Sequence, residues 1–298
     1  MTARVLRWSV LLLPVSLVLG LAPGLAARAT QGASEKSILV TVLDASGKPV
    51  KDLTAADFAI REDNVMREVT GAKLATEPLF ISLISDTSKP PVMRSIPVQD
   101  MRTGLTSFVH DVLAASPESQ IALGEFGGAA QTQVNFTNVA ANLEKGITKQ
   151  FPKDRTGSVM LEALIDSSKT LAKKASMRKA IVSLNLGPAP ESSQVTLKVV
   201  GDEFQKGGAS LWAVTIEQGI NPNREQALNV LTTNSGGLRL NTLSSSTVEA
   251  MLKSIADDLT SQYVVTFRRP DSSTPTVMTQ VGMNRQGVKP LARIWAPK

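Results

Sequence analysis

The chain has 298 residues, of which 42% are hydrophobic, 19% charged and 4% aromatic, with no cysteine and a single histidine. The absence of cysteine excludes disulfide scaffolds, thiol nucleophiles and Cys-ligated zinc or iron–sulfur sites, and one histidine excludes multi-histidine metal sites. The formal net charge is +6, but the basic residues form no long run interleaved with aromatic side chains, so nucleic-acid binding is not expected.

The first 29 residues have the order of an export signal. Arg4 and Arg7 precede an apolar core at residues 10–19, and small residues lead to Ala27-Arg28-Ala29. That core is shorter than the roughly 20 apolar residues that a membrane-spanning helix needs, and Ala-x-Ala is a motif that signal peptidase cleaves. We therefore expect a signal peptide at residues 1–29 and an exported mature protein, periplasmic or extracellular, without stable membrane insertion. An uncleaved membrane anchor is the alternative.

Strands and turns are predicted in the next segment. Apolar residues fill Ile38–Leu43, a polar turn follows at 44–49, and a second strand at 57–61 leads into the acidic turn Glu62-Asp63-Asn64. Thr54 lies three residues before Asp57, which is the spacing of a cap for a single helical turn. We expect an N-terminal β segment at residues 30–76.

Between residues 77 and 261, short apolar runs alternate with amphipathic ones. That alternation is typical of strands joined by crossover helices around a buried, mostly parallel sheet. A run of alternating residues at 131–136 predicts an antiparallel edge strand. The other expected strands lie at 79–84, 121–123, 180–184 and 210–215, and the expected helices at 98–113, 159–174, 194–204, 223–233 and 246–260.

After residue 262 the hydrophobic period returns to two. Tyr263, Val265 and Phe267 share one face, Val281 and Met283 repeat the pattern, and residues 288–295 could form a last strand. Because both flanks are rich in predicted strands, we expect residues 262–298 to pair with residues 30–76 in a small β domain. The middle domain would then be an insertion between strands that pair with each other.

Several short motifs have the order and spacing of a known family. Gly47-Lys48-Pro49-Val50 opens the β segment, Asp86-Thr87-Ser88 follows the first central strand, Thr156-Gly157-Ser158 opens a helix, and Ser261–Val265 begins the closing strand. In this arrangement the chain resembles secreted bacterial proteins related to the von Willebrand factor A domain. The resemblance implies a Rossmann-like α/β domain at residues 77–261, with a mostly parallel sheet flanked by helices.

The resemblance also implies a metal-ion-dependent adhesion site, in which Asp-x-Ser-x-Ser, a threonine and an aspartate surround a divalent cation. Asp86 and Ser88 match this pattern. The threonine position falls on Ser158, or on Thr156 if the loop shifts, so a hydroxyl is kept there. Pro90, however, replaces the second serine, and the aspartate expected near Leu186 is absent. Because Mg²⁺ requires near-octahedral oxygen coordination, these ligands make a poor site. We expect a degenerate site with Asp86, Ser88 and Ser158 as vestigial metal ligands and no cofactor, and weak Mg²⁺ binding stays open.

The function expected from these observations is non-enzymatic binding of a protein partner, in the manner of an adhesion module. Two alternatives stay open: Mg²⁺-dependent adhesion through a partial metal site, and metal-assisted phosphoryl hydrolysis with Asp86 as the nucleophile. The second is disfavoured because such enzymes need another acid two residues later, where Ser88 stands. No catalytic residue is expected, and the predicted partner-binding rim consists of Asp86, Thr87, Ser88, Lys89, Ser158 and Asn185.

Overall fold

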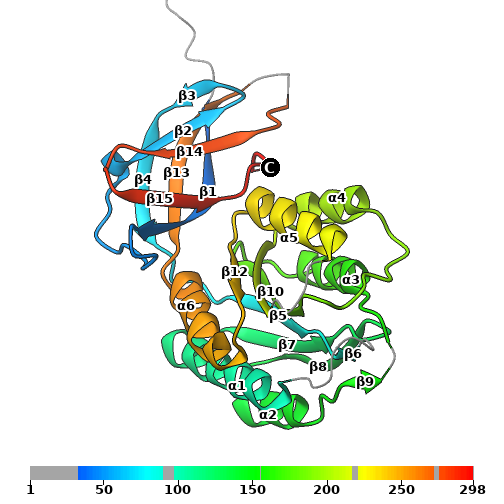
Figure 1. The fold of residues 1–298 in the computed structure, drawn as a ribbon. Coiled ribbons are helices and arrows are strands. Elements are labelled where there is room, and N and C mark those ends of the chain that lie inside the picture. Colours follow the sequence, from blue (N-terminus) through cyan, green and yellow to red (C-terminus); the bar gives the residue numbers. More distant parts are fainter. Residues whose placement is uncertain (1–32, 90–96, 155, 217–220, 272–274, 298) are drawn as a thin grey trace, which may run out of the picture.

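The computed structural model describes residues 33–89, 97–154, 156–216, 221–271 and 275–297. The expected signal peptide at residues 1–29 and the prediction concerning Pro90 lie outside these ranges. The described chain has a larger α/β part and a smaller β part, and the smaller part contains strands from both ends of the described sequence (Figure 1).

The α/β part is organised around a six-stranded sheet with the order β12-β11-β10-β5-β7-β8. Neighbours from β12 to β7 are parallel, and β8 runs antiparallel to β7, which confirms the predicted edge strand. Strand β12 was not predicted, because only one of its four residues is apolar. The strands are β5 (Phe80–Ser85), β7 (Gln120–Glu125), β8 (Gln131–Thr137), β10 (Lys179–Leu186), β11 (Ser210–Ile216) and β12 (Arg239–Thr242).

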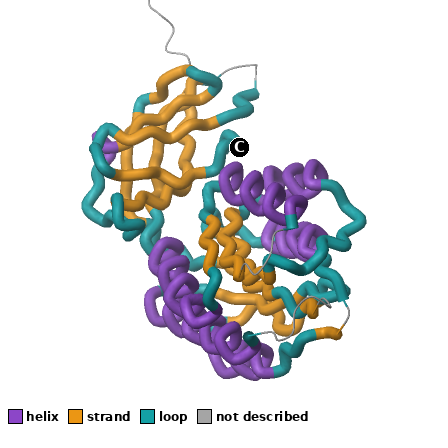
Figure 2. Tube along the Cα trace, in the orientation of Figure 1, coloured by secondary structure: helices purple, strands orange, loops and turns teal. Residues whose placement is uncertain are grey.

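Helices cover the sheet in two layers (Figures 1 and 2). Helices α1, α2 and α6 pack on one face, and α3, α4 and α5 pack on the other. Within the ranges that the structure describes, none of the helices is long and apolar enough to cross a membrane. The helices are α1 (Val98–Ala115), α2 (Ala140–Thr148), α3 (Met160–Ala172), α4 (Leu197–Gly207), α5 (Pro222–Ser235) and α6 (Val248–Thr260); α2 was not predicted.

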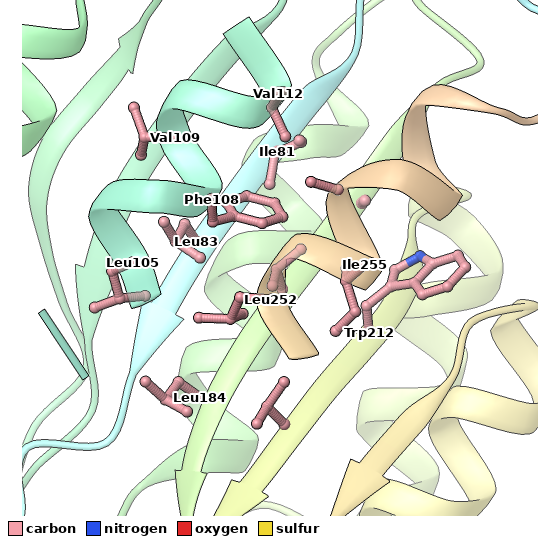
Figure 3. Packing of buried hydrophobic residues seen from close by; sticks show 14 of the residues in the cluster. Ile81, Leu83, Leu105, Phe108, Val109, Val112, Leu184, Trp212, Leu252 and Ile255 are labelled. Atoms are coloured by element: carbon pink, nitrogen blue, oxygen red, sulfur yellow. The ribbon is translucent and has the colours of Figure 1, made fainter. Parts of the chain in front are cut away.

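The central strands are apolar on both faces because helices cover both. Successive strand residues point to opposite faces of a sheet, so Leu83 packs in the cluster with α1 and α6 while Ile84 packs in the cluster with α3, α4 and α5. Figure 3 shows Phe108 and Leu252 packing from the helices onto the first face, together with the fully buried Trp212. This core fixes the strands whose carboxyl ends carry the predicted site residues.

Two further sheets form the β part, with the orders β15-β1-β13-β4 and β14-β2-β3. Strand β1 pairs antiparallel with both β13 and β15, and Ile38 lies opposite Val265. The Leu53 N–H donates a hydrogen bond of 3.0 Å to the buried Tyr263 hydroxyl, 210 residues away. The strands are β1 (Ala33–Asp44), β2 (Phe58–Glu62), β3 (Val65–Arg67), β4 (Val69–Leu74), β13 (Tyr263–Pro270), β14 (Thr279–Met283) and β15 (Val288–Ala292).

Short elements complete the chain. The single helical turn predicted after Thr54 is confirmed, and the Asp57 carboxylate accepts the Thr54 N–H at 2.7 Å. The short elements are this turn η1 (Ala55–Asp57), a second turn η2 (Ser245–Thr247), and the paired strands β6 (Ser88–Lys89) and β9 (Lys153–Asp154).

Candidate functional site

Three of the predicted site residues meet at the carboxyl edge of the central sheet. Strand β5 ends at Ser85, and Asp86 and Ser88 follow it directly. Strand β10 is the parallel neighbour of β5, with Leu184 opposite Ser85, so Asn185 reaches the same edge. In open α/β sheets, ligands bind in the crevice outside the carboxyl ends of the strands. The structure therefore brings these side chains to the edge where a binding site is expected.

The Asp86 carboxylate is fully buried and bonded on both oxygens. Its Oδ1 accepts hydrogen bonds from the N–H and the hydroxyl of Ser88, at 2.9 and 2.5 Å. Its Oδ2 lies 2.8 Å from Nη1 of Arg224 and accepts a longer bond of 3.4 Å from the Leu186 N–H. Hydrogen bonds within the Asp86–Ser88 turn thus occupy one oxygen of the Asp86 carboxylate, and the Arg224 guanidinium balances the negative charge of this carboxylate.

Arg224 comes from the first turn of α5, and its side chain is only 3% exposed. Asn221 caps this helix by accepting the Arg224 N–H at 3.2 Å, and Pro222 is its first residue, so the start of the helix is well defined. Nη1 also donates to the Leu186 carbonyl at 2.7 Å, and Nη2 donates to Oδ1 of Asn185 at 3.4 Å. The guanidinium therefore links α5 to the carboxyl ends of β5 and β10.

A second carboxylate, that of Glu191, faces the same arginine. Its Oε2 lies 3.7 Å from Nε of Arg224, and its Oε1 accepts hydrogen bonds from the hydroxyl and N–H of Ser193. Burial raises the pKa of the Glu191 carboxyl above its ordinary value, and the Asp86 charge adds to this rise, while Ser193 and Arg224 oppose it. Two carboxylates around one guanidinium make a buried ion cluster, which we call the Arg224 cluster.

Two buried hydroxyls lie beside the Arg224 cluster. Neither Thr87 Oγ1 nor Ser158 Oγ has a hydrogen-bond partner among the described residues. The Ser158 backbone bridges to Gly127 on one side and to Glu191 on the other. Gly127 approaches so closely that a Cβ there would lie 2.4 Å from the carbonyl carbon of Thr87. Gly127 therefore packs directly against the Asp86–Ser88 turn and connects it to the loop that carries Ser158.

The donor set of this site does not fit a divalent cation. Mg²⁺ needs near-octahedral oxygen ligands, whereas Asp86 Oδ2 is already in contact with the Arg224 guanidinium. Across the described ranges, no group of three or more His, Asp or Glu side chains could hold a metal ion. An aspartate at position 186 would not complete the site, because the Leu186 side chain packs in the apolar core. The geometry gives Asp86 a guanidinium as its counter-ion.

Exposed groups lie at the same edge of the sheet as the buried cluster. Lys89 is 36% exposed and pairs with Asp154 at 2.7 Å. Phe151 is 60% exposed, and the Arg102 guanidinium lies over its ring, 4.5 Å from the centroid. Leu243, 82% exposed, directly follows β12 and so lies at the same edge of the sheet. The structure buries the other five predicted rim residues. Their side chains position the surface, whereas these exposed groups can contact a partner.

Arg224, Glu191 and Phe151 were not among the site residues predicted from the sequence. For Arg224 a usable signal exists, because Asn221-Pro222 is a helix start that closely follows a predicted strand. An arginine in that first turn is near the carboxyl edge of a parallel sheet. For Glu191 and Phe151, which lie in loops, the sequence offers no comparable signal.

Comparisons with known proteins identify the fold. No family model matches the sequence, and no curated protein matches it. The structure is similar to a von Willebrand factor type A protein from Catenulispora acidiphila, with a TM-score of 0.52 and 8% identity over 90% of this chain and 75% of that chain. It is also similar to the D319A mutant of the PilB minor pilin from Streptococcus sanguinis, with a TM-score of 0.51 and 12% identity over 62% of each chain. The chain has a von Willebrand factor A-like α/β fold with a mixed sheet.

Proposed function

We propose that the protein is an exported, non-enzymatic module that binds a protein partner at the carboxyl edge of its von Willebrand factor A-like sheet, without an obligatory metal ion. The observation that carries this proposal is the contact of Arg224 with Asp86, 2.8 Å long and almost completely buried. The positive charge beside Asp86 therefore comes from a side chain of the protein and not from a bound metal ion. Binding at the surface above the cluster then needs no ion from solution.

The surface above the Arg224 cluster has the composition of a protein-binding site. We define the rim surface as Lys89, Arg102, Phe151 and Leu243. Aromatic and arginine side chains are enriched in protein interfaces, and clustered exposed apolar groups mark contact sites. Of these four, Phe151 with Arg102 over its ring is the expected anchor, because a large rigid side chain loses little conformational entropy on binding.

The state of Asp86 favours binding over phosphoryl hydrolysis. A carboxylate nucleophile must present an oxygen to its substrate. Both Asp86 oxygens are bonded, one to Ser88 and one to Arg224, and the side chain is fully buried. Mg²⁺-dependent adhesion, the other alternative, is separated from our proposal by the response of binding to a chelator.

A capture experiment tests the proposal. Immobilised mature protein is exposed to an envelope extract of its source organism, with either Mg²⁺ or EDTA present. We expect the same partner to be retained in both conditions, and Phe151→Ala to weaken its binding by about tenfold or more. The matched control is Met66→Ala, which removes an apolar side chain that is 55% exposed on β3 of the β part. Capture that requires Mg²⁺, or equal loss in both variants, would contradict the proposal.

The export part of the proposal rests on the sequence of residues 1–29. We expect protein recovered outside the cytoplasm to begin at Thr30, as determined by N-terminal sequencing or intact mass. Retention of residues 1–29 in a membrane fraction would indicate an anchor instead.

We also propose that residues 30–76 and 262–298 form one β domain that carries the α/β domain at residues 77–261. The pairing of β1 with β13 supports this division, as does the bond from Leu53 to Tyr263. Truncation after Thr260 should therefore remove hydrogen-exchange protection from residues 37–70. Unchanged protection in the truncated protein would contradict the division.

A further inference from the structure

A positively charged region lies at the amino end of the central sheet, where the α/β and β parts meet. It is a groove of about 480 Å³ lined by β1, by the start of β10, by the end of α4 and by the chain after β15. Among the described residues, its charged lining consists of four cations and one carboxylate: Lys36, Lys179, Lys206, Arg293 and Glu35. We call it the junction groove.

Arg293 has no acidic partner among the residues that the structure describes. Its guanidinium is partly buried, and its Nε donates a hydrogen bond of 3.1 Å to the Trp295 carbonyl. Burial lowers the pKa of the guanidinium below its ordinary value, and no carboxylate of the described residues offsets this effect. Because an arginine stays protonated at neutral pH, the groove contains a positive charge that no described carboxylate neutralises by direct pairing.

The backbone around Arg293 holds the guanidinium in place. Gly208 at the end of α4 has a φ of +72°, and a Cβ there would lie 3.0 Å from Nη1 of Arg293. A side chain at this position would therefore compete for the space that the guanidinium occupies. With Nε bonded to Trp295, the two Nη groups remain as donors toward the groove. A guanidinium presented in this way can donate two parallel hydrogen bonds to an oxyanion.

The other charged groups contribute mainly through the field that they create. Lys206 pairs with Glu203 at 2.9 Å, and Lys179 donates to the Lys174 carbonyl at 3.5 Å. The Glu35 carboxylate accepts a bond of 3.4 Å from the Thr70 hydroxyl, on the β part. The lysines add attraction for an anion over several ångströms.

We propose that the junction groove binds a phosphate or sulfate group, with Arg293 as its main hydrogen-bond donor. A tetrahedral oxyanion offers several acceptor oxygens, so two can accept from the Nη groups while the others face the lysines. The same chemistry can come from a free anion or from a phospholipid headgroup. This site is independent of the rim surface, which lies at the opposite edge of the sheet.

Calorimetry with inorganic phosphate at constant ionic strength is the first test. We expect the full mature protein to bind phosphate and Arg293→Gln to weaken that binding by about tenfold or more, because charge-assisted hydrogen bonds are lost. The matched control is Arg285→Gln, which removes the same charge from an exposed arginine that pairs with Asp52 at 2.8 Å. It should leave phosphate binding unchanged. Arg293→Lys keeps the positive charge but loses the two parallel N–H donors of the guanidinium, so it should bind phosphate with intermediate affinity.

Vesicles of phosphatidylglycerol, with phosphatidylcholine as the neutral control, are the second test. Arg293-dependent binding to these vesicles without binding of free phosphate would identify a lipid headgroup as the source of the group, and binding of free phosphate would identify a soluble anion. The proposal is overturned if the wild type binds neither probe, or if Arg293→Gln binds as well as the wild type. Circular dichroism establishes that each variant is folded, and Arg293→Lys replaces Arg293→Gln if the latter is not.

Discussion

Arg224 and Arg293 lie at opposite edges of the same sheet, and their surroundings differ. At the carboxyl edge, Arg224 is 2.8 Å from Asp86 and 3.7 Å from Glu191, and all three side chains are buried. At the amino edge, the Arg293 guanidinium is bonded to one backbone carbonyl and lines an open groove. The first charge is neutralised inside the protein, whereas the second is left for solvent or a ligand.

This difference separates a structural role from a binding role for the same residue type. A buried ion cluster tolerates no loss of one partner, because the remaining charge cannot return to water. A half-buried guanidinium without an acid contributes little to stability and keeps its hydrogen-bonding capacity. The carboxyl edge therefore acts through the exposed groups around it, and the amino edge acts through the arginine itself.

The largest expected effect is on stability at the carboxyl edge. Arg224→Leu should lower the free energy of unfolding by about 3–5 kcal/mol, because it leaves the buried Asp86 and Glu191 carboxylates without their cation. Urea unfolding followed by circular dichroism measures this loss. The double variant Arg224→Leu with Asp86→Asn should recover part of it. A loss below about 1 kcal/mol in the single variant would mean that the Arg224 cluster contributes no more to stability than a solvent-exposed ion pair does.

Asp258, unlike Asp86, has no cation beside it among the described residues. Asp258 on α6 is fully buried, and neither of its carboxylate oxygens has a partner among the described residues. Burial, with a smaller contribution from the Asp257 charge, raises the pKa of Asp258 from 3.8 to about 7. The folded state therefore keeps a proton that the unfolded state releases, and stability falls as the pH rises from about 4 to about 7.

Asp258→Asn removes this pH dependence. The stability advantage of the variant over the wild type should grow by about 3 kcal/mol between pH 5 and pH 8. Urea unfolding at both pH values checks the prediction. Asp257→Asn serves as the control and should show a smaller change. An advantage that does not grow with pH would mean that Asp258 is ionised and solvated in the folded protein.

The smallest expected effect is on stability at the amino edge. Arg293→Gln should change the free energy of unfolding by less than about 1 kcal/mol, because no ion pair with a carboxylate is lost. Phosphate should raise the melting temperature of the wild type but not of this variant, since a ligand of the folded state stabilises it. A loss as large as that of Arg224→Leu would mean that Arg293 has a structural role after all.

Most of the α/β architecture could be predicted from the sequence, because its strands are buried on both faces and its helices on one. The apolar runs at 79–84 and 210–215 and the helix stripe from Val98 to Leu113 coincide with β5, β11 and α1. Strand β12 was missed because only one of its four residues is apolar. Helix α2 was missed because it is only nine residues long, so Ala140, Leu143 and Ile147 repeat the helical period over little more than two turns.

The candidate site could be predicted only in part. Asp86, Ser88 and Asn185 follow apolar strands, so their position at one edge of the sheet follows from the parallel order. Their burial could not be predicted, because it depends on Arg224. This arginine lies 38 residues after Leu186 in the sequence, on helix α5. Amphipathic patterns assign such an arginine to the solvent side of a helix. Only the packing of α5 against β11, the neighbour of β10, turns it inward.

We infer that Arg224 supplies the positive charge that the resemblance assigned to a metal ion. Calorimetric titration of Mg²⁺ into the wild type and into Arg224→Ala tests it most directly. We predict no binding by the wild type, and measurable binding by the folded variant, in which Asp86, Glu191, Ser88 and Ser158 offer oxygen ligands around the vacated position. Micromolar Mg²⁺ binding by the wild type, unchanged in the variant, would contradict the claim.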